Sequence, residues 1–206
     1  MSAQTSPGDE ACASAEALIV RASSHPEESA RLRLSDCEGR PRTQALARLS
    51  RLARPHGIPP EGDPSAAPRP GLTYVAPGIP RLDPGLLTRL ATLARRWPDR
   101  RILIVSGVRP RARRSSRHRV ARALDVIVEG VERRRVSEFA RGLAATGVGY
   151  YPNSTFTHVD VRARAAYWID LSGPGERARY VRPAPEAAPH VATAAPPPTD
   201  VAPDPT

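Results

Sequence analysis

Apolar residues recur at helical spacing in three stretches of the chain, with polar residues between them. We therefore expect amphipathic helices over residues 43–53, 83–97 and 136–145. The second is the clearest. Asp83 is a favourable N-cap residue, and Pro84 occupies the first helical position, where its missing N–H costs nothing.

Short runs rich in β-branched and apolar residues indicate strands between and after these helices. The expected strands cover residues 31–35, 72–75, 102–105, 123–128, 148–151 and 156–162. The last two flank a turn at residues 152–154 and are expected to form a hairpin. Because helices and strands are intermixed and two strands are adjacent near the end, the pattern favours an α+β fold: a small antiparallel sheet flanked by helices.

Proline marks the expected boundaries, because sixteen of the 24 prolines lie within residues 55–80 and 183–205. Only one segment carries a continuous alternation of helices and strands. We expect, in chain order, a flexible N-terminal region over residues 1–30, a strand–helix extension with a proline-rich linker over 31–71, one domain over 72–180, and a disordered Ala/Pro-rich tail over 181–206.

The formal net charge is +10, and every basic residue other than histidine is arginine, since the chain contains no lysine. Such a charge suits an anionic partner such as nucleic acid, anionic lipid or cell-wall polymer. Arginine without lysine, together with abundant Ala, Pro and Gly, is also typical of a GC-rich genome. Charge alone therefore does not identify the partner.

Targeting and redox features are sparse in this sequence. No apolar segment reaches the roughly 18–20 residues needed to cross a membrane. The start lacks a basic region followed by an apolar one, so no signal peptide is visible. Cys12 and Cys37 do not have CxxC spacing, and whether they form a disulfide stays open.

Two histidines and two aspartates supply the chemistry that stands out. Side chains alternate along a strand, so His158 and Asp160 share one face of the last expected strand. If that strand lies beside the strand over 123–128, Asp125 converges on the same face, and His118 from the preceding loop can fold over it. Two His and one Asp make a three-ligand zinc site with one open position for water.

Such a site is suited to amide hydrolysis, because zinc activates water and polarises a carbonyl. The reaction needs a general base, for which Asp160 is the nearest candidate. Asp160 is equally suited to hold the distal nitrogen of a ligand histidine. Arg109, which follows the strand over 102–105, is a candidate to steer a carboxylate or stabilise an oxyanion.

The same residues carry a family resemblance over about residues 72–180. The segments are Ser106-Gly107-Val108-Arg109, Ser116 to Asp125, Gly147 to Pro152, and Phe156-Thr157-His158-Val159-Asp160. They resemble the zinc site of the superfamily of D-alanyl-D-alanine metallopeptidases, hedgehog domains and lysostaphin-type peptidases, in particular its YcbK-like branch, which acts on bacterial peptidoglycan.

The resemblance implies that His118, Asp125 and His158 bind zinc, that Arg109 binds substrate or stabilises the transition state, and that Ser116 lines the cleft. Tyr150 and Tyr151 are further candidates to line the cleft, although we expect one of them to belong to the core. The implied protein is a zinc metallopeptidase of the cell envelope or a secreted one, cleaving peptide stems or cross-links as an endopeptidase or D,D-carboxypeptidase.

The chain departs from the family pattern at three positions. Ala121 replaces the usual Gly, Val108 replaces the usual Tyr, and Thr155 stands where many relatives place a Glu base. The last change motivates an alternative, a zinc-bearing cell-wall binding module without catalysis. A further alternative, an Arg-rich nucleic-acid binder using residues 109–122, leaves the histidines and aspartates unexplained.

Overall fold

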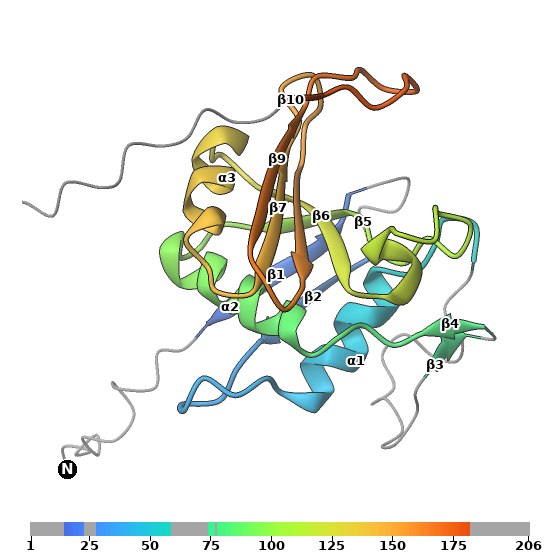
Figure 1. Cartoon of the computed structure of the whole chain (residues 1–206). Helices are drawn as coiled ribbons and strands as arrows, with labels where there is room; N and C mark the ends of the chain where they lie inside the picture. The colour runs from blue at the N-terminus through green and yellow to red at the C-terminus, as the bar shows by residue number, and fades with distance from the viewer. Residues whose placement is uncertain (1–14, 23–27, 59–73, 77, 182–206) are drawn as a thin grey trace, which may run out of the picture.

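The computed structural model describes residues 15–22, 28–58, 74–76 and 78–181. It confirms the α+β class, with a mixed eight-stranded sheet and three α-helices (Figure 1). The strand order is β10-β9-β7-β8-β6-β5-β1-β2. The strands of this sheet are β1 (Glu16–Arg21), β2 (Ser29–Arg33), β5 (Ile102–Ser106), β6 (Ala123–Val128), β7 (Thr146–Tyr150), β8 (Thr157–Val161), β9 (Ala166–Asp170) and β10 (Tyr180–Val181).

One face of the sheet carries the hydrophobic core. Helices α1 (Thr43–Leu52), α2 (Gly85–Arg96) and α3 (Arg133–Arg141) all contribute to it. Because side chains alternate along strands, Leu124 of β6 and Val159 of β8 enter this core while their neighbours face the other way. A two-stranded ribbon of β3 (Tyr74–Ala76) and β4 (Ile79–Pro80) precedes α2.

Helix α2 begins at Gly85, one residue later than predicted, and Pro84 is its N-cap residue. Pro84 has helical backbone angles, and Asp83 Oδ1 accepts a hydrogen bond of 2.8 Å from Gly85 N. This bond satisfies one of the backbone N–H groups that a helix leaves free at its start. Helix α3 lies earlier than predicted, at Arg133–Arg141 rather than 136–145, because Glu132 is extended and the helix begins directly after it.

The N-terminal part of the chain corrects the sequence-based expectation. Residues 1–30 were expected to be flexible, yet Glu16–Arg21 forms β1, which pairs with β2 and, in parallel, with β5. The sheet is therefore larger than predicted, and it is mixed, since β7 and β9 also pair in parallel. Strand β9 was not predicted. Residues 59–71 of the expected extension and linker, the tail beyond residue 181 and Cys12 lie outside the described residues. Cys37 is disulfide-bonded.

The connection from β5 to β6 folds over the second face of the sheet and contains a 3₁₀ turn, η2 (Arg117–Val120). Backbone hydrogen bonds fix it: Val108 N donates to Ala53 O, Arg109 N donates to His118 O, and Asp83 N donates to Ala121 O. Ala121 ends η2 in the left-handed region, with φ 56°. The connection thus brings His118 back against the sheet. None of the helices within the described residues is of the length and apolarity that crossing a membrane requires.

Candidate metal centre

Strands β6 and β8 are antiparallel neighbours, as the sequence analysis assumed. Asp125 pairs directly with His158, and Ala123 pairs with Asp160. The alternation of side chains then places Asp125, His158 and Asp160 on the face opposite the helices. All three are buried, at 2%, 6% and 0% exposure. Ionisable groups buried this deeply need partners or a metal ion.

The loop before β6 supplies His118, which is 1% exposed. Its Nδ1–H donates a hydrogen bond of 2.6 Å to Gly107 O, a group that can only accept. Nε2 of His118 therefore faces the cluster. Gly107 has to be glycine, because a Cβ there would overlap the backbone of Ala53 at the end of α1.

The four buried side chains form a compact arrangement. His118 Nε2 lies 3.2 Å from Asp125 Oδ1 and 3.1 Å from His158 Nδ1, and His158 Nδ1 lies 2.9 Å from Asp125 Oδ1. His118, Asp125 and His158 each contribute one atom to a group that could hold a metal ion. The structure thus brings together all three residues that the sequence analysis assigned as ligands.

Asp160 contacts the far side of His158. The Nε2–H of His158 donates to Asp160 Oδ2 at 3.2 Å, which leaves the Nδ1 lone pair facing the cluster. Arg162 holds both Asp160 oxygens, through Nε to Oδ1 at 2.6 Å and through Nη2 to Oδ2. Burial alone would raise the pKa of Asp160, but the hydrogen bonds from Arg162 and His158 outweigh it and hold the pKa well below its usual range.

The charges of the two aspartates also act on His158. Burial alone would lower the pKa of this imidazole, but hydrogen bonds with Asp125 and Asp160 outweigh it and raise the pKa. The pKa of Asp125 is correspondingly held below its usual range, because hydrogen bonds from His118 and His158 exceed the effect of its burial.

Arg109 lies at the open side of the cluster. Its Nη2 is 3.5 Å from Asp125 Oδ2, while its side chain is 51% exposed. A guanidinium with one end at the cluster and the rest in solvent can reach a bound ligand. The role of Arg109 towards a substrate stays a prediction.

The other residues predicted to line the cleft lie in different places relative to the cluster; they are Ser116, Tyr150 and Tyr151. Ser116 precedes η2 and has no side-chain capping bond to it. Tyr151 accepts a hydrogen bond of 3.2 Å from Trp168 Nε1, and the Trp168 ring lies 5.1 Å from the His158 ring. Burial raises the pKa of Tyr151 to about 12. Tyr150 ends β7 on the opposite face from Gly149, so it does not join this group.

Several residues at the site were missed by the sequence analysis as contributors. Gly147 and Gly149 pair with Asp160 and His158. A Cβ at Gly147 would overlap Asp160 and Arg162, and one at Gly149 would lie 2.7 Å from Trp168. The sequence did contain a sign of their role: two glycines separated by one residue lie in β7, the strand that pairs with the strand of His158. Trp168 and Arg162 had no such signal.

Comparisons with known proteins identify the same region. Residues 78–167 match a family model described as "Peptidoglycan L,D-endopeptidase MepK". Curated proteins of that name from Escherichia coli strain K12, Escherichia coli O157:H7 and Shigella flexneri are each 33% identical over 108 residues, covering 46% of this chain. The match covers 59% of each relative's length. No solved structure matched.

The matched residues include the whole buried cluster together with Arg109, Asp160 and Arg162. The resemblance noted in the sequence is therefore confirmed by an independent comparison and by the geometry of the residues that carry it. Over residues 78–167, this chain is therefore similar to the M15 peptidase family whose model is described as peptidoglycan L,D-endopeptidase MepK.

Proposed function

We propose that this protein is a zinc-dependent peptidase that cleaves peptide stems or cross-links of bacterial peptidoglycan. The buried triangle of His118, Asp125 and His158 is the observation that carries the proposal. The printed name of the relatives favours an L,D-endopeptidase over a D,D-carboxypeptidase. The sequence-based prediction had left these two activities open.

The donor set and its spacing fit zinc. Two imidazoles and one carboxylate are typical of catalytic zinc sites, which keep a fourth position for water. A tetrahedral ion with ligand bonds of about 2.0–2.1 Å holds its ligand atoms roughly 3.3 Å apart. The corresponding distances between the three donor atoms are 2.9, 3.1 and 3.2 Å, so a small outward adjustment admits the ion.

When bound, zinc would supply a water with a pKa near about 7 and would polarise the scissile carbonyl. The chain's own residues orient its ligands. Gly107 O keeps the proton of His118 on Nδ1, and Asp160 keeps that of His158 on Nε2, so that each ring offers a lone pair. Such partners restrict the tautomer and the ring orientation of ligand histidines.

Asp160 acts in this proposal as a positioning residue. The sequence analysis named it as the proton acceptor, with positioning of a ligand histidine as the alternative. Both of its oxygens are occupied by Arg162 and His158, and its lowered pKa makes it a weak base. Arg109 is the group placed to contact the substrate carbonyl or a substrate carboxylate.

The proposed location is the cell envelope or the extracellular space, which is where a peptidoglycan substrate lies. The disulfide at Cys37 supports this location, because disulfides persist in oxidising compartments. The net charge of +10 would also favour an anionic wall polymer.

The test measures zinc content and muropeptide release for the wild type, Asp125→Asn and Asp170→Asn. Asp170 is a matched control, since it is a buried aspartate on the same face that accepts hydrogen bonds from backbone N–H of Ser172 and Arg179. We expect zinc and activity in the wild type and Asp170→Asn, and loss of both in Asp125→Asn. Equal zinc in all three proteins contradicts the assigned site.

The same experiment separates catalysis from binding. A zinc-bearing wall-binding module is the alternative, and Thr155 in place of a Glu base is the observation that favours it. This module would retain zinc and sediment with peptidoglycan but release no muropeptides. That outcome would overturn the peptidase proposal and leave the metal site intact.

A further inference from the structure

A second cavity lies beside the metal centre and is built partly by residues outside the family match. Its volume is about 720 Å³. One wall comes from the end of α1 and the residues after it, including Leu52 and Ile58, and the other from the end of β5 and residues 107–112. The α1 wall precedes residue 78, where the family match begins.

The lining of this cavity combines basic and apolar side chains. Five basic side chains line it, and no acidic side chain of the described residues does: Arg21, Arg54, His56, Arg109 and Arg111. Apolar side chains such as Leu52, Ile58 and Val105 supply much of the remaining wall. The lining therefore fits a ligand that combines small apolar groups with a negative charge.

Two of the arginines are fixed parts of the scaffold. Arg21 is 2% exposed and donates to the carbonyls of Leu52, Arg54 and Pro55. Arg54 is 6% exposed and is held by Glu28 at 2.6 and 2.7 Å. Arg21 Nε has no hydrogen-bond partner. Because Glu28 pairs with Arg54, Arg21 is the buried cation that leaves this wall positive, and its bonds to three carbonyls already hold it in place.

The exposed arginines complete the cavity on its other side. Arg109 and Arg111 are both exposed. Arg109 lines the cavity and also lies 3.5 Å from Asp125 of the metal cluster. Within the described part of the chain, Arg111 makes no ion pair. Its guanidinium is therefore available to a ligand carboxylate, a group that arginine binds with two parallel hydrogen bonds.

The cavity and the metal centre share the short segment Gly107 to Arg109. Gly107 lines the cavity, and its carbonyl accepts the hydrogen bond from His118 Nδ1. Arg109 also belongs to both, since it lines the cavity and lies 3.5 Å from Asp125 Oδ2, so the cavity adjoins the cluster at the end of β5.

We propose that this cavity is a subsite for a carboxylate-bearing segment of a short peptide, with Arg111 and Arg109 binding the carboxylate and the apolar wall accepting small side chains. The inference rests on the proposed peptidase function, because peptidoglycan stem peptides combine alanine methyl groups with free carboxylates. The segment around α1, which precedes the family match, would thereby contribute to substrate selection.

The test measures binding of a stem tetrapeptide with free carboxylates and of the same peptide with its carboxylates amidated. Calorimetry on the full chain, zinc-loaded and after chelation, keeps binding separate from hydrolysis. We expect the free acid to bind about tenfold or more tightly than the amide, since hydrogen bonds to charged groups are among the stronger ones. Equal affinities for acid and amide would overturn the proposal.

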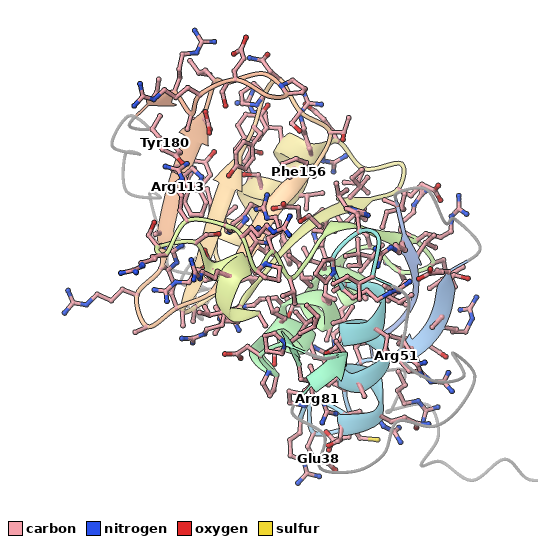
Figure 2. All side chains as sticks on the ribbon, turned by 90° about the vertical axis from the view of Figure 1, so that its right-hand side faces the viewer. Glu38, Arg51, Arg81, Arg113, Phe156 and Tyr180 are labelled. Atoms are coloured by element: carbon pink, nitrogen blue, oxygen red, sulfur yellow. The ribbon has the colours of Figure 1, made fainter. Side chains whose placement is uncertain are left out.

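Variants locate the binding within the cavity. Arg111→Gln removes an exposed cation, and Ala112→Trp fills the space; both should weaken binding of the free acid about tenfold. Arg113→Gln is the matched control on the same loop, because Arg113 does not line the cavity and lies with Tyr180 on the opposite side of the molecule from Arg51 of α1 (Figure 2). It should change binding less than about twofold.

The two proposals can fail separately. Unchanged affinity in Ala112→Trp, with an intact fold by circular dichroism, would reject the cavity whatever the activity of the protein. Wild-type protein that binds the free acid in the cavity but releases no muropeptides would support the subsite and reject the peptidase.

Discussion

Replacing Asp160 with asparagine tests how the chain prepares His158 to bind a metal ion. Asp160 is fully buried and makes contacts with His158 on one side and Arg162 on the other. The substitution keeps the size of the side chain and one oxygen acceptor but removes the negative charge. It therefore isolates the electrostatic part of the contact from its shape.

The expected effect is weaker metal binding with a small effect on folding. Loss of the hydrogen-bonded partner of a ligand histidine weakens metal affinity by about 10- to 100-fold. Because Asn retains an acceptor for the Nε2–H of His158, we expect the lower end, about tenfold, which corresponds to about 1.4 kcal/mol. Arg162 loses its charged partner, but its side chain remains 23% exposed and can contact water.

A competition titration against a chelator of known zinc affinity measures this change. Asp170→Asn serves again as the control, because it changes a buried carboxylate on the same face that contacts backbone N–H groups instead of His158. Circular dichroism and thermal unfolding confirm that both variants fold. If Asp160→Asn binds zinc within about twofold of the wild type, the reasoning about His158 is refuted, since the range for such partners starts near tenfold.

Three further outcomes follow from the geometry. Gly147→Ala should lower the free energy of unfolding by about 1–3 kcal/mol in urea titrations and weaken zinc binding, because its Cβ would overlap Asp160 and Arg162. Below the raised pKa of His158, zinc affinity should fall by about tenfold per pH unit, because one proton must leave the imidazole before the ion binds. Calorimetry in two buffers of different ionisation enthalpy measures the released proton. Ala121→Val should cost about 1–3 kcal/mol, because a β-branched residue is strained at φ 56°, whereas Ala121→Gly should change the free energy of unfolding by less than about 1 kcal/mol.

Ala121 shows what a sequence pattern alone leaves open. Alanine where relatives usually carry glycine was notable only if the position required a positive φ, and the structure has φ 56° there. The left-handed backbone costs about 1–2 kcal/mol for a residue with a Cβ. Alanine offsets part of this, because it loses less chain entropy than glycine and buries a methyl group at 1% exposure. The turn after His118 therefore tolerates the substitution.

The metal cluster could be predicted from the sequence because few residue types bind a metal and because a strand alternates its faces. His158 and Asp160 share a face on any regular strand, and only the adjacency of β6 and β8 had to be assumed. Residues that reach the cluster only through pairing of strands far apart in the sequence could not be predicted in this way. Trp168 reaches His158 only because β9 pairs with β7 in parallel, and nothing local in the sequence specifies that pairing.

Strand β1 illustrates the same limit at the level of the fold. Its apolar run is only four residues long, from Ala17 to Val20, and the small and polar residues around it suggested a loose segment. The strand is stabilised instead by partners on both sides, since it pairs with β2 and with β5, and Ile19 is fully buried. Long-range pairing of this kind overrides weak local preference. The consequence is functional, because Arg21 at the end of β1 forms part of the cavity beside the metal centre.

The two glycines of β7 show how the packing of the sheet makes room for the residues around His158. Val148 points into the core opposite Val159, so the residues on either side of it must face the metal centre. At Gly147 the missing Cβ leaves room for the Asp160–Arg162 pair, and at Gly149 it leaves room for Trp168 against His158. Glycine in a strand interior is unfavourable by roughly 0.5–1 kcal/mol relative to alanine. Two such residues in one strand are therefore explained by the space that the side chains around His158 require rather than by the stability of the sheet.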